Sequence, residues 1–257
     1  MIDVLILNLN CLAHTKNIID DLSRQTVKQF HVTLVDQAST EGGTEEYLRV
    51  IEGFPWITVV KNPINQSITF EWNKFVANSE KPYVAILNND IRITSNFVEH
   101  GVIALQNPEI GSVMHPTNHP NYGRASSICT YELLPAKQFM QGWDIFMKRE
   151  VWTPIPEVLK LYSGDAFQHE EIYKQGYMAA MLTSSPIIHY EGATQHNKLN
   201  GKVVKDFAGD ITRYTNMGYK RRLKAPSAYT VISFRKSRLE WLLEGDGTPI
   251  PKGEEIG

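Results

Sequence analysis

The first 110 residues alternate short apolar runs with segments whose apolar residues recur at helical spacing. Runs of this length between turn residues are typical of buried strands, and the intervening segments are typical of helices. Buried strands that alternate with helices indicate an α/β fold with a parallel sheet and right-handed crossovers. The strands are expected at Val4–Leu9, His31–Val35, Trp56–Val60 and Tyr83–Leu87, and the helices at Asn17–Gln25, Thr44–Ile51, Phe70–Asn78 and Phe97–Leu105.

The second half of the chain is less regular. Pro, Asn, Gly, Ser and Tyr dominate His115–Phe139, which predicts loops or short strands. Gly142–Arg149 has strand character, and Asp165–Gln175 is expected to be a helix that ends at the following glycine. Met178–Ile188 is expected to be a strand built partly from small residues.

Composition excludes several classes of protein. Of the 257 residues, 42% are hydrophobic and 21% are charged, which is typical of a globular domain and not of a disordered chain. The two cysteines, Cys11 and Cys129, do not make a disulfide framework, and Cys11 is expected in the core. No transmembrane segment is expected, because no apolar stretch reaches about 18 residues. The first residues show no signal-peptide pattern, so a cytoplasmic location is expected, with peripheral membrane association as an alternative.

Charge is distributed unevenly along the chain. Residues 1–200 carry a net charge of −6, whereas residues 201–240 hold 10 Lys and Arg against 3 Asp and Glu, a net charge of +7. Aromatic residues are interspersed with these basic residues, a combination that suits an anionic partner such as a membrane surface or a nucleic acid. The alternative is a helical appendage that packs its aromatic side chains on the main domain.

Polar residues follow each of the four predicted strands. They are Asn8 and Asn10, Asp36, Asn62, and the run Asn88–Asp90. Ligands bind at the carboxyl ends of the strands in sheets of this kind, which makes these residues candidates for a binding site. Asn and Asp also favour turns and helix caps, so each could instead have a purely structural role.

Several of these motifs, taken in order, resemble the family 2 glycosyltransferases of the GT-A fold. Val35–Thr40 is similar to the family's Val-Asp-Asn-Gly-Ser-Thr, and Asn62–Asn65 to its Asn-Pro-Glu-Asn. Glu71–Asn73 stands where the family has Ala-Arg-Asn. Leu87–Asp90 stands at its metal-binding Asp-x-Asp turn, with Asn88 in place of the first Asp.

The resemblance extends over about residues 2–197. Gly142–Val151 is similar to the family's Gly-x-x-Met-Leu-Ile-Arg-Arg-Glu-Val. Gly164-Asp165, followed by Gly176-Tyr177, is similar to its Glu-Asp…Ala-Gly-Tyr, although Gly164 replaces the Glu. Ile187–Gly192 is similar to the terminal strand that ends in His. The resemblance implies a Rossmann-like, mostly parallel sheet flanked by helices, with a C-terminal helical and basic extension.

The resemblance also implies a metal site. Asp90 is the only carboxylate in its turn and is the expected ligand of a divalent cation, with His189 as the second ligand. Such a cation neutralises a leaving diphosphate. Because imidazole suits transition metals, Mn²⁺ is favoured over Mg²⁺.

The remaining site residues also follow from the resemblance. Asp165 is expected to be the general base that takes the proton of the acceptor hydroxyl. A helix N-cap is its structural alternative. Trp143 and Asp144 are expected to line the sugar or acceptor pocket, and His115, His119 and Arg124 could contact the acceptor. The nucleotide and donor are expected to contact Asn8, Asn10, Asp36, Asn62, Asn73, Asn88 and Asn89.

These observations predict a single GT-A domain whose nucleotide-sugar-binding half is 1–110 and whose acceptor-binding and catalytic half is 111–200, followed by a basic and aromatic extension and tail at 201–257. The expected activity is inverting transfer of a sugar from a nucleotide-diphosphate donor, with a UDP-sugar favoured, to an acceptor hydroxyl. A catalytically weak or inactive GT-A binding module is the alternative. The acceptor could be a lipid-linked or surface glycan or a modified nucleic-acid base. A nucleotidyltransferase is disfavoured, because no glycine-rich basic loop follows the first strand.

Overall fold

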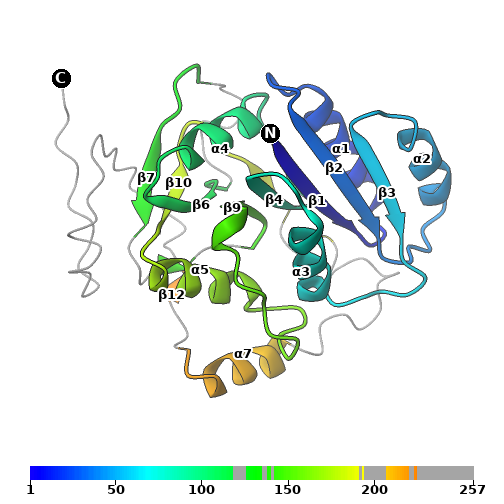
Figure 1. The fold of residues 1–257 in the computed structure, drawn as a ribbon. Helices are drawn as coiled ribbons and strands as arrows, with labels where there is room; N and C mark the ends of the chain where they lie inside the picture. Colours follow the sequence, from blue (N-terminus) through cyan, green and yellow to red (C-terminus); the bar gives the residue numbers. More distant parts are fainter. Residues whose placement is uncertain are drawn as a thin grey trace.

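One eight-stranded sheet forms the centre of the protein, with the strand order β3-β2-β1-β4-β9-β6-β10-β7 (Figure 1). The computed structural model describes residues 1–117, 126–134, 138–139, 142–190, 193, 207–219 and 223–224. The strands of this sheet are β1 (Ile2–Asn8), β2 (Phe30–Asp36), β3 (Ile57–Lys61), β4 (Tyr83–Asn88), β6 (Ile110–Met114), β7 (Tyr131–Leu134), β9 (Asp144–Lys148) and β10 (Met178–Leu182).

The first four strands are parallel, as the alternation of strands and helices predicts. β1 lies between β2 and β4, and β3 pairs with β2 at one edge. The sheet then continues into the second half of the chain, where β9 is antiparallel to both β4 and β6. β10 is parallel to β6, and β7 closes the other edge as an antiparallel strand. Residues on both sides of position 110 therefore share one sheet, most of whose strands run in one direction.

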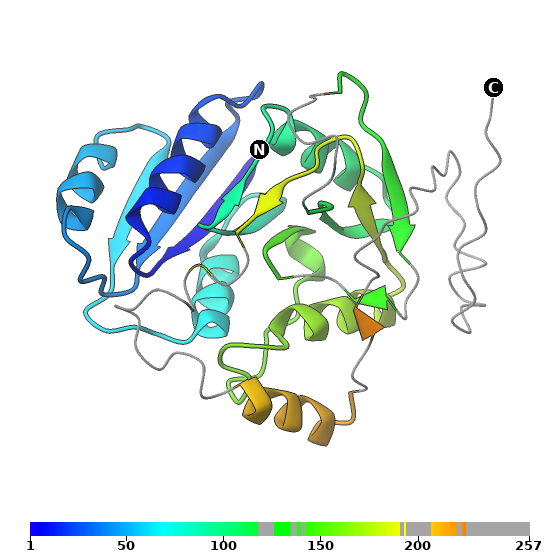
Figure 2. The same ribbon diagram turned by 180° about the vertical axis from the view of Figure 1, so that it is seen from behind.

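Helices cover both faces of the sheet. One hydrophobic core contains side chains of α1 (Leu12–Ser23), α2 (Thr44–Ile51) and α4 (Phe97–Leu105). The other contains side chains of α3 (Ile68–Asn78) and α5 (Gly164–Lys174), and also Tyr214 of α7 (Phe207–Asn216). Figure 1 shows α3 and α5 on the near face, and Figure 2 shows α1 and α2 on the opposite face. The fold is the predicted mixed α/β architecture.

Short elements complete the structure. β5 (Ile91–Arg92) and β11 (Ile188–His189) form a separate antiparallel pair, in which His189 lies opposite Ile91. Arg149–Val151 is a single turn of 3-10 helix. The backbones of β8 (Gln138–Phe139) and β12 (Leu223–Lys224) pair in parallel. The β5–β11 pair matters most, because it brings a residue from position 189 next to the turn at position 90.

Several boundaries differ from the sequence-based predictions. α1 begins at Leu12, five residues earlier than expected, because Cys11 turns the chain through a left-handed conformation (φ 58°) without a side-chain cap. β6 was not expected, since its sequence contains Gly111 and Ser112 and lacks a long apolar run. The strand expected over Met178–Ile188 ends at Leu182 and resumes as β11.

Candidate active site

A buried hydrogen-bond network underlies the carboxyl ends of β1 and β4. Asn8 is wholly buried and accepts a hydrogen bond from Thr15 Oγ1 at 2.6 Å. Its Nδ2 donates to Asp36 Oδ1 at 2.6 Å. Asn89 Nδ2 donates to Thr15 Oγ1 at 3.1 Å. Both polar atoms of the Asn8 side chain are thus used inside the protein, so Asn8 ties together the carboxyl ends of the central strands and has no exposed surface in this structure.

Asp36 forms the turn after β2. Ser39 donates to it twice, from its backbone N to Oδ2 at 3.1 Å and from its hydroxyl to Oδ1 at 2.6 Å. Both the structural prediction for Asp36, an Asx turn into Ser39, and its predicted place at the strand end are therefore realised. Asn10 is also buried, and its Oδ1 accepts the backbone N–H groups of Thr40 and Glu41 at 2.8 and 2.9 Å. Asn10 thereby fixes the backbone of the loop that follows Asp36.

Asn62 and Asn73 are also engaged with protein groups. Asn62 Nδ2 donates to the buried Glu71 at 2.7 Å. Asn73 Nδ2 donates to the Ile155 carbonyl at 2.8 Å, and its Oδ1 accepts from Trp152 Nε1 at 3.2 Å. Asn73 therefore joins α3 to the segment that leads towards α5. The structure does not bring it together with the strand-end residues.

Asp90 and His189 lie side by side, as the resemblance implies. Their Oδ1 and Nε2 atoms are 3.4 Å apart, and both side chains are about nine-tenths buried. Asp90 Oδ1 has no hydrogen-bond partner among the described residues. An orphaned buried carboxylate oxygen next to an imidazole nitrogen fits a divalent cation, since both are ligands of first-row metals. No group of three or more such side chains occurs in the described part of the chain. Phosphate and water oxygens are common further ligands of divalent cations.

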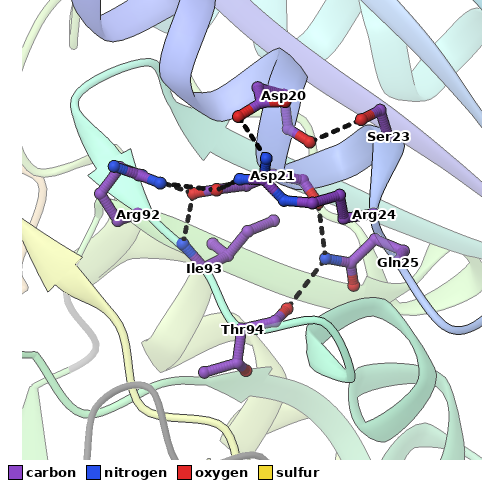
Figure 3. A network of polar contacts seen from close by, with 8 residues as sticks. All are labelled: Asp20, Asp21, Ser23, Arg24, Gln25, Arg92, Ile93 and Thr94. Carbon is purple, nitrogen blue, oxygen red and sulfur yellow. Dashed lines mark hydrogen bonds and ion pairs between the residues drawn. The ribbon is translucent and has the colours of Figure 1, made fainter.

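A polar network joins β5 of the β5–β11 pair to α1 (Figure 3). Arg92 of β5 donates to both oxygens of the buried Asp21 of α1, at 2.7 and 2.8 Å. The backbone N–H of Ile93 donates to the same carboxylate at 3.1 Å. A bidentate pair of this kind fixes orientation as well as distance. The network therefore fixes the strand that begins directly after Asp90 and pairs with the strand of His189.

Trp143 and Gly142 join the Asp90–His189 pair to Asp165. The Trp143 ring lies on the His189 ring with centroids 4.9 Å apart, and the Trp143 carbonyl accepts the backbone N–H of Asn88 at 2.8 Å. Gly142 lies against the carboxyl group of Asp165, so closely that a Cβ atom at Gly142 would be 3.0 Å from Asp165 Oδ2. The structure thus brings Trp143 and three predicted residues of the catalytic and metal sites, Asp90, Asp165 and His189, into one continuous set of contacts.

Asp165 lies in the first turn of α5 and is not its N-cap, because that position belongs to Ser163. Burial raises the pKa of Asp165 to about 6, and hydrogen bonds from the backbone N–H groups of Ala166, Asp165 and Gly142 oppose this rise. A carboxyl group with a pKa near the working pH is suited to accept and release a proton. The environment of Asp165 therefore matches that of a general base.

Asp144 does not face a pocket. It is wholly buried and pairs with His115 Nδ1, and the Phe97 ring stacks on His115 at 4.1 Å. Burial raises the pKa of the Asp144 carboxyl well above its usual value and lowers that of His115 well below it. Burial thus disfavours the charged form of both groups, which are hydrogen-bond partners within the core. Neither the sugar contact predicted for Asp144 nor the acceptor contact considered for His115 is available to them in this structure.

Some predicted residues lie outside the described part of the chain. They are His119 and Arg124 of the proline-rich segment, and Lys220, Arg221 and Arg222 of the basic segment. Conversely, sequence reasoning missed Thr15 and Glu71, whose buried hydrogen bonds link elements far apart in the chain. No spacing or composition signal distinguishes either residue from an ordinary helix residue. Among the described residues, no helix is long and apolar enough to cross a membrane.

A Rossmann-like half with a carboxylate–histidine pair at its strand ends, continued by a mixed second half, defines the GT-A class of enzyme folds. The model of glycosyl transferase family 2 matches residues 3–145, more than half of the chain. The chain therefore belongs to this family. A search of curated proteins by sequence gave no match.

Solved structures share the fold at low sequence identity. The mannosyltransferase PcManGT of Pyrobaculum calidifontis, in complex with GDP-Man and Mn²⁺, has a TM-score of 0.60 and 18% identity, covering 76% of this chain and 59% of its own. Residues 1–349 of S. aureus TarS have a TM-score of 0.58 and 14% identity, covering 73% and 60%. GalNAc-T7, solved with UDP, GalNAc and Mn²⁺, has a TM-score of 0.59 and 11% identity, covering 74% and 43%. The chain thus spans at most about 60% of the length of these structures.

Proposed function

We propose that this protein is an inverting, metal-dependent glycosyltransferase that uses a nucleotide-diphosphate sugar, with a UDP-sugar as the favoured donor. The observation that carries the proposal is the set of contacts from Asp90 through His189, Trp143 and Gly142 to Asp165. In this proposal Asp90 and His189 form the cation-binding pair and Asp165 is the base, and the two are linked through the adjacent residues Trp143 and Gly142. Solved structures of the same fold that contain GDP-Man or UDP together with Mn²⁺ support the same chemistry.

The roles of the residues follow from their surroundings. Asp165 accepts the proton of the acceptor hydroxyl as that oxygen forms a bond to the sugar C1 and the bond from C1 to the diphosphate breaks. The proton then passes from Asp165 to solvent, and the nucleoside diphosphate leaves. Asp90 and His189 would hold the divalent cation, which supplies neutralisation of the charge on the leaving diphosphate. The imidazole ligand favours Mn²⁺ over Mg²⁺.

A screen of nucleotide sugars tests this proposal. Bound donor stabilises the folded state by mass action, so the correct donor raises the melting temperature in the presence of Mn²⁺ and not in the presence of a chelator. Asp165→Asn should keep this shift and lose transfer by at least ~10²-fold, the usual lower range for a general base. Transfer near the wild-type rate in Asp165→Asn would assign the base to another residue.

A catalytically weak or inactive binding module is the second candidate, favoured by Asn88 in place of the family's first turn carboxylate. The two candidates differ in one cheap measurement. An active enzyme hydrolyses its donor slowly without acceptor in a Mn²⁺-dependent manner, whereas a binding module binds the donor and leaves it intact. Gly164, the other departure, is explained by packing, since a Cβ there would be 3.0 Å from Thr69 Cγ2.

The acceptor class depends on residues 201–240. We propose that their excess of positive charge positions an anionic acceptor surface, either a membrane with a lipid-linked glycan or a nucleic acid. Two of their aromatic residues instead contact the main domain: Tyr214 is buried against it, and Tyr219 lies at 5.4 Å from Phe167 of α5. The basic residues of this segment are the candidates for partner binding, and three of them, Lys220, Arg221 and Arg222, form a run that is called the basic triplet.

A further inference from the structure

The loop that leads into α5 is held from two sides. On one side, α3 contributes Thr69, whose hydroxyl donates to the Leu159 carbonyl and whose backbone N–H donates to the Lys160 carbonyl at 3.4 Å. On the other side lies α7, a helix from beyond the segment matched by the family model (Figure 1). The loop ends in Ser163, which has a left-handed backbone conformation (φ 66°) that a non-glycine residue adopts only when its surroundings enforce it.

Asp210 of α7 fixes the loop from the second side. Its side chain is wholly buried, and it accepts hydrogen bonds from three consecutive backbone N–H groups, at 3.4, 2.8 and 2.9 Å. Arg213, one turn later in α7, donates to the same carboxylate at 2.6 Å. The three donors belong to Lys160, Leu161 and Tyr162.

The charge of Asp210 suits this arrangement. Burial alone would raise its pKa, but the hydrogen bonds from the loop and from Arg213 together lower it, so the carboxylate stays ionised. Hydrogen bonds to an ionised acceptor are about twice as strong as neutral ones. A single buried carboxylate therefore fixes three peptide groups that end three residues before Asp165.

We infer that Asp210 is a positioning residue for the catalytic base, acting through loop 160–162 on Asp165. The inference rests on the proposed function, in which Asp165 is the base. α7 then does more than append a charged segment to the domain, because it completes the geometry of the active site from outside the segment that the family model matches. Misplacement of a reacting group by about 1 Å can reduce a rate by about 10²-fold. A small shift of this loop, transmitted to Asp165, is therefore enough to lower the rate of transfer.

The test is a double-mutant cycle between Asp210→Asn and Asp165→Asn. Asp210→Asn keeps the size of the side chain but removes the charge and one acceptor oxygen. It should lower kcat by roughly 10–100-fold in the wild-type background. Binding of nucleoside diphosphate with Mn²⁺, measured by titration calorimetry, should stay unchanged. In the Asp165→Asn background the same substitution should change the residual rate by less than about threefold, because the group it positions is gone.

Tyr219→Phe is the matched control. Tyr219 joins the same C-terminal segment to α5 by a hydrogen bond to Glu171 at 2.7 Å, and its ring packs on Phe167 of that helix. Its loss should lower the melting temperature and leave kcat unchanged.

Two results would overturn the inference. One is a kcat of Asp210→Asn within about threefold of the wild type, and the other is an equal loss in both backgrounds. If Asp165→Asn itself retains transfer, the proposed base is wrong, which is a separate failure. A melting curve of each variant ensures that rates are compared per folded molecule.

Discussion

Replacement of Asp165 by Asn should stabilise the folded protein at neutral pH while it lowers the rate of transfer by at least ~10²-fold. The pKa of this carboxyl rises from 3.8 to about 6 on folding, chiefly because burial disfavours the charged form. A difference of one pH unit in pKa corresponds to roughly 1.4 kcal/mol, so ionised Asp165 lowers the free energy of unfolding by about 3 kcal/mol. Asn retains an acceptor oxygen for the backbone N–H groups and carries no charge, so it avoids this cost.

The raised pKa of Asp165 also determines how the free energy of unfolding changes with pH. Below pH 3.8 the carboxyl is protonated in both the folded and the unfolded state and has no effect on stability. Between that value and about pH 6 the unfolded state ionises first, so stability falls as the pH rises. Above this window the full cost is present. The difference in free energy of unfolding between Asp165→Asn and the wild type should therefore grow from near zero at about pH 4 to about 3 kcal/mol above pH 7.

Urea unfolding at two pH values, in the presence of a chelator, measures this difference. The exposed Asp20→Asn is the matched control, and its free energy of unfolding should stay within about 0.5 kcal/mol of the wild type at both values. In the wild type, transfer should also decline as the pH falls below about 6, because a protonated Asp165 cannot accept a proton. The reasoning is refuted if Asp165→Asn is no more stable than the wild type at neutral pH, or if its advantage is the same at both pH values.

Three further predictions concern the cation pair, its support and the basic segment. Asp90→Ala should abolish Mn²⁺-dependent binding of nucleoside diphosphate in titration calorimetry without a change in circular dichroism, and an unchanged affinity would contradict its role as a ligand. Arg92→Ala leaves the buried Asp21 without its bidentate partner, so the free energy of unfolding in urea should fall by about 1–3 kcal/mol, whereas the exposed Arg49→Ala should have little effect. Replacement of the basic triplet by Ala should weaken binding to anionic vesicles or to DNA and flatten its salt dependence, with donor hydrolysis unchanged; a lower melting temperature with equal losses in both reactions would instead indicate a structural role.

Sequence periodicity predicted the regular elements of the first half well. α2 and α4 begin and end at the expected residues, because their apolar residues recur at helical spacing and face one core. Periodicity failed where an element lacks such a signal. β6 contains a glycine and a serine, and it becomes a strand because β9 and β10 supply pairing partners on both sides. α1 begins at a left-handed residue that no side chain caps, so its start carries no mark in the sequence.

The candidate site was predictable to the extent that the sheet determines it. Asp36 and Asp90 follow parallel strands, and the carboxyl ends of such strands meet at one edge. Which of the strand-end amides are buried depends on contacts between distant residues, such as the hydrogen bond from Thr15 to Asn8. The role of Asp210 depends on a helix that begins more than 40 residues after the loop it holds, and no local pattern reveals such a pair.

The segment from Gly142 to Asp144 explains why the second half of the site resists prediction from types of residue alone. Three consecutive positions serve three different surroundings: Gly142 leaves room for Asp165, Trp143 packs on His189, and Asp144 enters the core against His115. Gly142 and Trp143 form a turn before β9 begins at Asp144, so the alternation of side chains along a strand does not predict the direction of either residue. The type of residue favours a place in the pocket for Asp144, because carboxylates are seldom fully buried unless they are paired. The burial of Asp144 is therefore possible only because His115, 29 residues earlier in the chain, meets it there.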